Sequence, residues 1–459
     1  MRLLLDLVYF LAALAVSPIL VYRVIRHGRY RTGWAQRFGK VSRKGPGKKC
    51  IWLHAVSMGE VNAAKTLVTE IEKQFPDCEI VVSTTTDTGY AQADKLFGRK
   101  GSVFYFPFDI SWIIRRAFNR LEPSICLLME LEVWPNFLFA AHQRHIPVVV
   151  LNGRISDRSF SRYRRIRCVT RTFFGRIDRV LAQTEQYAER FRDLGCPAER
   201  VLVTSSLKYD TAQVADRVEG AQVLAEQLNL GAARLWVAGG TGNDEEKIVL
   251  DVYKSLVQEP AFRDLRLAVV PRKPERFDEV AQLIEQMGFP VVRYSRLKGT
   301  PRGEGVPPLR HEAILASPPK EGRGTPAQRD KGGTPSPQRA VILGDTMGDL
   351  RKFYSLAEII FVGRTLVPMG GSDMMEAAAL GKCTLFGPHT FNFRQTVEVL
   401  LQGHGAIEVK DSDDLLATMK KCLSDRAHAQ AVARAGQQII RENQGATAKT
   451  MEVLRTLLQ

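Results

Sequence analysis

Acidic and basic side chains stand where short apolar runs of this chain give way to helix-forming segments. In residues 52–61, "WLHAVSMGEV", Glu60 follows Ser57 at the S-x-x-E spacing of a helix capping box. A carboxylate at that point can stabilise the helix start through the helix dipole, or it can act as a general base towards a hydroxyl group. On these ten residues alone, both interpretations stay open.

The same half of the chain has further charged groups after apolar runs. Residues 129–136, "MELEVWPN", place Glu130 and Glu132 before a helix that we expect to begin near Pro135. Residues 205–210, "SSLKYD", place Lys208 after the last apolar run of this half. Between them lie five clustered arginines, which form either a solvated helix face or a phosphate-docking surface: Arg154, Arg158, Arg162, Arg164 and Arg165.

The second half of the chain has four loops that contain glycine turns or basic residues. They read "AGGTGNDEEK" from 238, "VVPRKPERF" from 269, "LGDTMGDLRKFY" from 343 and "VGRTLVPMGGSDMMEAAALGK" from 362. Backbone amides at glycine-rich helix starts bind phosphate, Arg272 adds positive charge, and Glu376 can accept from ribose hydroxyls. The G-x-G-x-x-G spacing and the Walker lysine are missing, yet four converging loops predict a nucleotide site.

The elements that position these residues are strands and helices in alternation. Apolar runs such as "CIWLHA" and "EIVVSTT" alternate with amphipathic segments through residues 50–210, and a second series from "RLWVAGG" to "CTLFGP" does so through 211–440. This pattern predicts an α/β protein with two doubly wound, Rossmann-like domains, whose ligands bind in the cleft that the strand ends face. Residues 298–338, rich in Pro, Gly, Arg and Lys, are predicted to be a disordered insertion. A last helix in residues 441–459 is predicted to pack back on the first domain.

Composition limits the function classes. The chain has 459 residues and a formal charge of +16, which favours an anionic partner: nucleic acid, an acidic membrane or a phosphorylated substrate. No nucleic-acid recognition module or aromatic-basic interleaving is present in the sequence, so we predict no nucleic-acid partner. Seven scattered cysteines without a C-x-x-C pair indicate reduced thiols, and we predict neither a metal site nor a cofactor.

The chain begins with an apolar segment. Residues 3–22 are about long enough to cross a bilayer as a helix, which needs roughly 20 residues. Residues 23–49 are strongly basic, which holds that flank in the cytoplasm and disfavours a cleaved signal peptide. The sequence therefore predicts that residues 1–22 are a single-pass anchor and 23–49 a basic juxtamembrane segment, with the catalytic body on the cytoplasmic side of the membrane.

These motifs, in this order, resemble the 3-deoxy-D-manno-octulosonic acid (Kdo) transferases of lipopolysaccharide assembly. The resemblance rests on "WLHAVSMGEV", "MELEVWPN", "LNGRISDRS", "PRKPERF", "LGDTMGDL", "FVGRTLVPMGG" and "EAAALGKCTLFGPHTFNF". It implies the two-domain GT-B glycosyltransferase fold with a membrane anchor. It also implies metal-free, inverting transfer of Kdo from CMP-Kdo to a phosphorylated lipid A precursor, lipid IVA, at an anionic membrane surface.

The resemblance also implies roles for single residues. Glu60 matches the family's general base, and Glu130 and Lys208 match positions that support the transition state. The segments implied to hold the CMP moiety contribute Pro271, Arg272, Met347, Gly348, Asp349, Gly371, Asp373, Met374, Met375 and Glu376. A useful base needs a pKa raised from about 4.3 towards neutrality, which desolvation or the charge of Glu130 can supply against the effect of the helix start.

The chain departs from the family pattern in its donor loops. Ser372 and Asp373 stand where a histidine and an asparagine are usual, so a carboxylate enters a phosphate-facing loop. The usual S-T-H turn is replaced by residues 240–242, Gly-Thr-Gly, and a Gly-Asn pair by Ser205 and Ser206. These changes leave three alternatives open: a GT-B transferase with another nucleotide-sugar donor, a sugar-nucleotide epimerase, and an inactive membrane-tethered nucleotide-binding protein.

Overall fold

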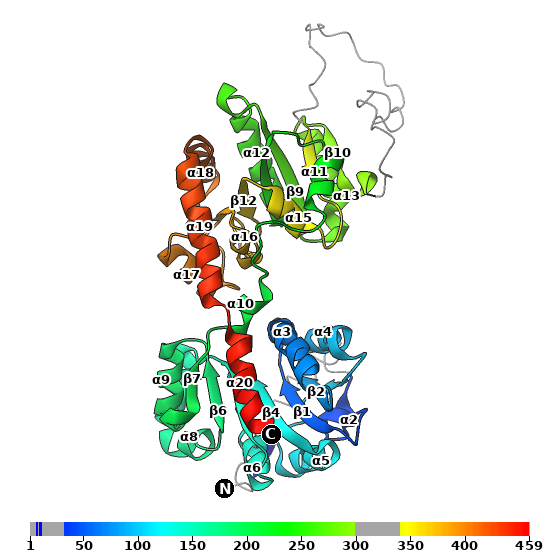
Figure 1. Ribbon diagram of the computed structural model, residues 1–459, viewed down its shortest axis with the longest axis vertical. Coiled ribbons are helices and arrows are strands. Elements are labelled where there is room, and N and C mark those ends of the chain that lie inside the picture. Colours follow the sequence, from blue (N-terminus) through cyan, green and yellow to red (C-terminus); the bar gives the residue numbers. More distant parts are fainter. Residues whose placement is uncertain (1–5, 8, 12–31, 299–339, 459) are drawn as a thin grey trace. The chain divides into compact units, whose positions relative to one another are not determined.

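The computed structural model describes residues 6, 7, 9–11, 32–298 and 340–458. The chain forms two compact units, Met1–Thr211 with Asn443–Gln459, and Ala212–Glu442 (Figure 1). Each unit is built on a parallel seven-stranded sheet. The predicted α/β class with two parallel sheets is confirmed.

The sheet of the first unit has the strand order β3-β2-β1-β4-β5-β6-β7. The chain starts in the middle at β1, moves outward to β3 and returns to the other side through β4, so the fold is doubly wound with its switch point between β1 and β4. The strands are β1 (Lys49–His54), β2 (Cys78–Thr84), β3 (Ser102–Tyr105), β4 (Pro123–Met129), β5 (Val148–Gly153), β6 (Arg179–Ala182) and β7 (Val201–Val203). The helices are α2 (Trp34–Arg37), α3 (Met58–Gln74), α4 (Asp87–Phe97), α5 (Ser111–Leu121), α6 (Pro135–Gln143), α7 (Asp157–Arg165), α8 (Arg167–Phe174), α9 (Glu185–Leu194), α10 (Leu207–Thr211) and α20 (Ala446–Leu458).

The sheet of the second unit repeats this plan with the order β10-β11-β9-β8-β12-β13-β14. Its strands are β8 (Arg234–Thr241), β9 (Leu265–Pro271), β10 (Val291–Arg293), β11 (Val341–Leu343), β12 (Ile359–Val362), β13 (Cys383–Phe386) and β14 (Ile407–Glu408). Its helices are α11 (Ala221–Gln227), α12 (Glu245–Leu256), α13 (Phe277–Gln286), α14 (Tyr294–Leu297), α15 (Leu350–Leu356), α16 (Met375–Ala379), α17 (Arg394–Gln402), α18 (Ser412–Ser424) and α19 (Arg426–Asn443). The sequence did not predict β14, because two residues are too short to show a strand period.

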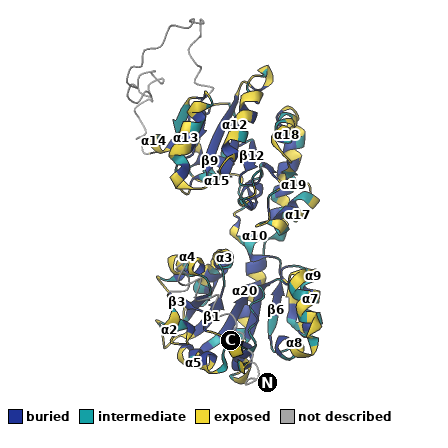
Figure 2. Ribbon diagram, turned by 180° about the vertical axis from the view of Figure 1, so that it is seen from behind, coloured by how far each residue is buried: buried dark blue, intermediate teal, exposed yellow. Residues whose placement is uncertain are grey.

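Both faces of the first sheet are buried, which explains its continuous apolar strands (Figure 2). Trp52 packs against Phe118 and Phe137 on one face, whereas its neighbour Leu53 belongs to the core on the opposite face. That second core also contains Met451 of α20, and α20 packs on α3. The end of the chain is thus part of the hydrophobic core of the first unit.

Two segments singled out in the sequence fall largely outside the described residues. These are the apolar residues 3–22, of which five are described, and the insertion 298–338, of which only Lys298 is described. Within residues 6, 7, 9–11, 32–298 and 340–458, no helix combines the length and apolar character needed to cross a membrane.

The fold predicts a large cost for breaking one buried ion pair of the second unit. The fully buried Glu246 accepts from Arg276 Nη1 at 2.6 Å and from Thr241 Oγ1 at 2.8 Å. A Glu246→Gln variant leaves the buried guanidinium without this partner, so unfolding of the second unit should become easier by about 3 kcal/mol. As a control, Glu72→Gln breaks the more exposed Lys100–Glu72 pair and should cost less than about 1 kcal/mol. Calorimetric unfolding measures both, and equal losses would contradict the expected importance of the buried pair.

Candidate active site

Glu60 lies in the first turn of α3, directly beyond the carboxyl end of β1. Its carboxylate accepts hydrogen bonds from Ser57 Oγ at 2.9 Å and from Val56 N at 2.9 Å, while the Glu60 amide donates to Ser57 Oγ. The capping motif therefore forms, although the glutamate reaches the amide of Val56 instead of that of Ser57. Since the side chain is only half-buried, a substrate can still approach it.

Burial and then the neighbouring charge of Glu130 raise the pKa of Glu60 to about 7, against the hydrogen bonds from Val56 and Ser57. Glu130 directly follows β4, the neighbour of β1 in the sheet, and has a left-handed backbone with φ of 54°. This conformation is costly for a non-glycine residue and is typical of functional sites. Glu60 thus has the tuning that a general base needs near neutral pH.

Lys208 lies on α10, which packs against the helix of Glu60. The start of α10 is held by Asn152, a buried residue near the end of β5 with φ of 54°. Asn152 Oδ1 accepts from Leu207 N at 3.1 Å and from Ser206 Oγ at 3.1 Å. Asn152 is not among the predicted site residues; the available signal was its polar side chain near the end of an otherwise apolar strand.

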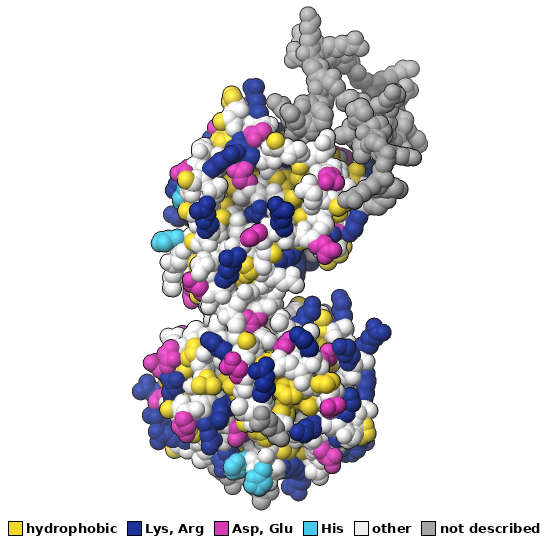
Figure 3. Space-filling view, in the orientation of Figure 1, with side chains coloured by type: hydrophobic (Ala, Val, Ile, Leu, Met, Phe, Trp, Pro, Cys, Tyr) yellow, Lys and Arg dark blue, Asp and Glu magenta, His cyan; other side chains and the backbone are white. Residues whose placement is uncertain are grey.

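The other charged residues singled out in the first unit have structural contacts. Glu132 Oε2 accepts from Trp134 Nε1 at 3.0 Å and lies 3.7 Å from His54 Nε2. Helix α7, which contains most of the clustered arginines, has no buried residue, and Arg164 forms an ion pair with Asp193 at 3.8 Å. The solvated-face interpretation of α7 therefore agrees with the structure. On the face shown in Figure 3, Lys and Arg side chains are spread over both units instead of gathering in one patch.

The glycine-rich loops of the second unit follow neighbouring strands. Gly240 is the penultimate residue of β8, Arg272 follows β9, Gly348 lies in the turn after β11, and the loop from Gly370 to Glu376 follows β12. Gly240, Gly348, Gly370 and Gly371 all have φ between 67° and 89°, a region that favours glycine. Ser372 Oγ donates to the Gly240 carbonyl at 2.8 Å and ties the loops after β8 and β12 together.

Two acids of these loops differ in their contacts. Although burial opposes it, hydrogen bonds from Lys298, Lys352 and Thr346 lower the pKa of Asp349 to about 2. Asp349 therefore stabilises its loop through ion pairs with Lys298 and Lys352. Burial, followed by the charge of Asp373, raises the pKa of Glu376, which lies in the first turn of α16.

The remaining predicted donor residues lie at the ends of the same strands or at the start of α16. Pro271 is the last residue of β9, Arg272 and Met347 are exposed, and Met374 and Met375 are buried at the start of α16. Asp373 Oδ1 accepts from Met375 N at 2.9 Å, so the unusual aspartate caps α16. The helix dipole favours a negative charge at this position.

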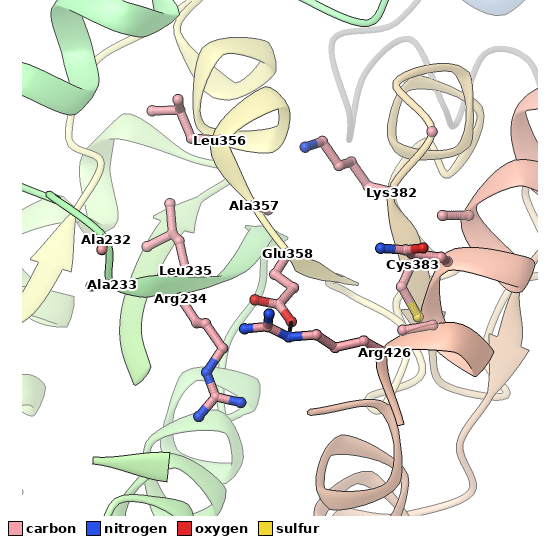
Figure 4. Close-up of a pocket in the computed structure, with 14 residues that line it drawn as sticks. Ala232, Ala233, Arg234, Leu235, Leu356, Ala357, Glu358, Lys382, Cys383 and Arg426 are labelled. Carbon is pink, nitrogen blue, oxygen red and sulfur yellow. Dashed lines mark ion pairs between the residues drawn. The ribbon is translucent and has the colours of Figure 1, made fainter. Parts of the chain in front are cut away.

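A cavity of about 430 Å³ lies where the strands of the second sheet begin, at the end of the sheet opposite the predicted donor loops. Figure 4 shows Arg234, Glu358, Lys382 and Cys383 lining it from the beginnings of β8, β12 and β13, with Arg426 paired to Glu358. Ligands of doubly wound sheets bind at the carboxyl ends of the strands. This cavity is therefore separate from the predicted donor loops.

These features define the class of protein: two parallel α/β sheets of GT-B type, with an acid tuned towards neutrality in one unit and glycine-rich loops in the other. Among solved structures, a glycosyltransferase from Rickettsia africae matches 90% of this chain and 99% of its own with a TM-score of 0.52 at 12% identity. A putative UDP-N-acetylglucosamine 2-epimerase from Listeria monocytogenes matches 90% of this chain and 97% of its own with the same TM-score of 0.52 at 13% identity. At these identities the two matches show the fold alone.

Sequence relatives identify the family. Residues 32–211 match the family model of the 3-deoxy-D-manno-octulosonic-acid transferases. The 3-deoxy-D-manno-octulosonic acid transferase of Haemophilus influenzae is 30% identical over 95% of this chain and 93% of its own, and that of Bordetella pertussis is 30% identical over 98% and 99%. The chain belongs to the Kdo transferase family, which confirms the resemblance seen in its motifs.

The raised pKa of Glu60 predicts the pH dependence of activity. A protonated carboxyl cannot accept a proton, so kcat/KM should fall as the pH drops through about 7 and level off above it. In a Glu130→Gln variant, the neighbouring negative charge is absent, ionised Glu60 is less destabilised, and the acid limb should move to lower pH. The matched control Glu72→Gln should leave the limb in place. An unshifted limb in Glu130→Gln would contradict the electrostatic coupling.

The predicted position of Asp373 beside the phosphate of CMP implies that its charge weakens donor binding. In an Asp373→Asn variant, the side-chain oxygen can still accept from Met375 N, while the repulsion of a nearby phosphate disappears. CMP should therefore bind about threefold to tenfold more tightly, as removing one nearby charge at partial screening implies. Asp413→Asn, at the exposed start of α18, is the control. Calorimetric titration with CMP measures both, and unchanged affinity in Asp373→Asn would place the phosphate elsewhere.

Proposed function

We propose that this Kdo transferase moves Kdo from CMP-Kdo to the phosphorylated lipid A precursor lipid IVA, in lipopolysaccharide core biosynthesis at the inner membrane. Family membership supports the transferase activity and the sugar. The observation that carries the proposed mechanism is Glu60, a half-buried carboxylate at a strand end whose pKa is raised to about 7. The particular acceptor is inferred from the resemblance and from the chain's positive charge.

The proposed reaction is a single displacement that inverts the anomeric centre. Glu60 takes the proton from the acceptor hydroxyl as the oxygen attacks the anomeric carbon of Kdo, and the bond to CMP breaks with its electron pair moving to the phosphate. Lys208 supplies positive charge and Glu130 tunes the base. Arg272 and the amides near Gly371 would hold the phosphate of CMP, and Glu376 would bind its ribose.

The altered donor loop is the observation that favours an alternative. Asp373 stands where the family pattern has an asparagine, so a different nucleotide-sugar donor is the second candidate. An inactive nucleotide-binding protein is the third. These candidates differ in what they turn over: another donor gives a different product, and an inactive protein binds CMP without transfer.

The localisation belongs to the same proposal. We propose that the chain attaches to the cytoplasmic face of the inner membrane through its first 22 residues and its basic segment 23–49. The sequence predicts a spanning helix for this attachment.

The proposed reaction predicts product from the wild type and almost none from a Glu60→Gln variant. The assay follows labelled Kdo from CMP-Kdo to lipid IVA with purified full-length protein. CMP affinity should be equal in both proteins, because the predicted donor residues lie in the other unit. Equal product from both proteins would show that Glu60 is only a helix cap. CMP binding without product in the wild type would favour the second or third candidate, and assays with other donors separate these two.

A further inference from the structure

The cavity at the beginnings of the strands in the second unit has the size and lining of a small-molecule site. Its volume is about 430 Å³, and its walls come from residues 232–235, 356–358, 381–383 and 426–433. These segments belong to the start of β8, the stretch between α15 and β12, the start of β13, and α19. Alanine and leucine side chains line it together with a few charged groups. Ligand pockets of proteins commonly combine an apolar lining with a few polar groups in this way.

Arg234 belongs to the wall of the cavity and is fully used by the protein itself. Its Nε and Nη2 atoms donate to the carboxylate of Asp264 at 2.8 Å and 2.5 Å. Nη2 also donates to the Ala261 carbonyl at 2.6 Å, and Nη1 donates to the Leu423 carbonyl at 3.2 Å. The charge of Arg234 is therefore balanced by Asp264, and its side chain is fixed in one position.

Glu358 and Arg426 form a loose ion pair in the cavity. Arg426 Nε lies 3.8 Å from Glu358 Oε1, which is longer than a hydrogen bond (Figure 4). Within the part of the chain that the structure describes, the Glu358 carboxylate accepts no hydrogen bond. The Arg426 side chain is 68% exposed and the Glu358 side chain 27%. The carboxylate can therefore still accept hydrogen bonds, and the guanidinium can still donate them.

Lys382 supplies the unbalanced charge of the cavity. It directly precedes β13 and is half-buried, and its ammonium group has no ion pair or hydrogen bond with any described residue. Burial lowers the pKa of Lys382, while the charge of Glu358 opposes this effect from a longer distance. Desolvating an ammonium group is costly unless an anion compensates its charge. The cavity thus combines two internally paired charges with one positive charge that lacks a counterion.

We infer that this cavity is a binding site for a small hydroxylated anion, a sugar acid or a sugar phosphate. Lys382 and Arg426 donate to the carboxylate or phosphate oxygens of the ligand, and Glu358 accepts from one of its hydroxyl groups. The alanine and leucine side chains contact its carbon atoms. The site lies at the opposite end of the strands from the predicted donor loops, so its ligand binds without competing with CMP. The inference goes beyond the proposed transfer reaction and does not depend on it.

A ligand-observed NMR titration with purified full-length protein tests the site. The probes are D-gluconate for the sugar acids and glycerol 3-phosphate for the sugar phosphates, and glycerol is the uncharged control. At least one anion should bind saturably with a Kd of about 1 mM or tighter, and glycerol should bind much more weakly. Binding of neither anion, or equal binding of glycerol, would overturn the inference. Displacement of the bound anion by CMP would also overturn it, because the probe would then occupy the donor loops.

A charge-removing variant tests the role of Lys382. Lys382→Gln should weaken binding of the anion at least about tenfold, which corresponds to the loss of one charged hydrogen bond. The matched control is Lys420→Gln on α18, since Lys420 pairs with Glu259 at 2.6 Å and does not line the cavity. This control should bind the anion as the wild type does. Unchanged affinity in Lys382→Gln, or an equal loss in both variants, would contradict the proposed site.

Thermal unfolding separates a loss of binding from a loss of structure. Because Lys382 has no partner within the described residues, Lys382→Gln should unfold at the same temperature as the wild type or higher without ligand. Addition of the anion should raise the unfolding temperature of the wild type more than that of the variant. An equal rise in both proteins would show binding elsewhere and overturn the inference. Neither experiment requires transfer, so failure of the proposed reaction leaves the inference testable.

Discussion

The glycine-rich loops of the second unit depend on two adjacent buried carboxylates at the start of α12. Glu245 accepts hydrogen bonds from the amides of residues 364–366 after β12, and Glu246 pairs with Arg276 beyond β9 and accepts from Thr241 at the end of β8. Burying two carboxylates is costly unless every oxygen is satisfied. This constraint ties three strand ends to one helical turn, so the glycine-rich loops are held in a fixed arrangement before any ligand binds.

The first unit uses a carboxylate at a helix start in another way. Burial raises the pKa of both Glu60 and Glu245, but Glu245 is inaccessible and accepts four backbone amides, whereas Glu60 is half-buried beside Glu130. Accessibility therefore separates the structural acid from the proposed general base. Capping is also compatible with the proposed role of Glu60, since its amide donates to Ser57 Oγ at the helix start while Ser57 Oγ and Val56 N donate to its carboxylate and orient it.

The sequence predicted the parts of this protein that local patterns encode. Continuous apolar strands such as β1 and acids at strand ends are visible in the chain, because burial on both faces and helix starts leave a periodic signal. The hydrogen bond from Val56 N to Glu60 left no such signal, because it depends on how the chain turns between β1 and α3.

The loop after β12 can accommodate the carboxylate of Asp373 because the helix start next to it stabilises a negative charge. Asp373 is stabilised by the amide of Met375 and by the positive end of α16, so its charge is partly balanced. Burial, followed by the charge that remains on Asp373, raises the pKa of Glu376. The carboxylate of Asp373 thus has two electrostatic effects in this loop: its own charge is partly balanced at the start of α16, and it disfavours the ionised form of Glu376.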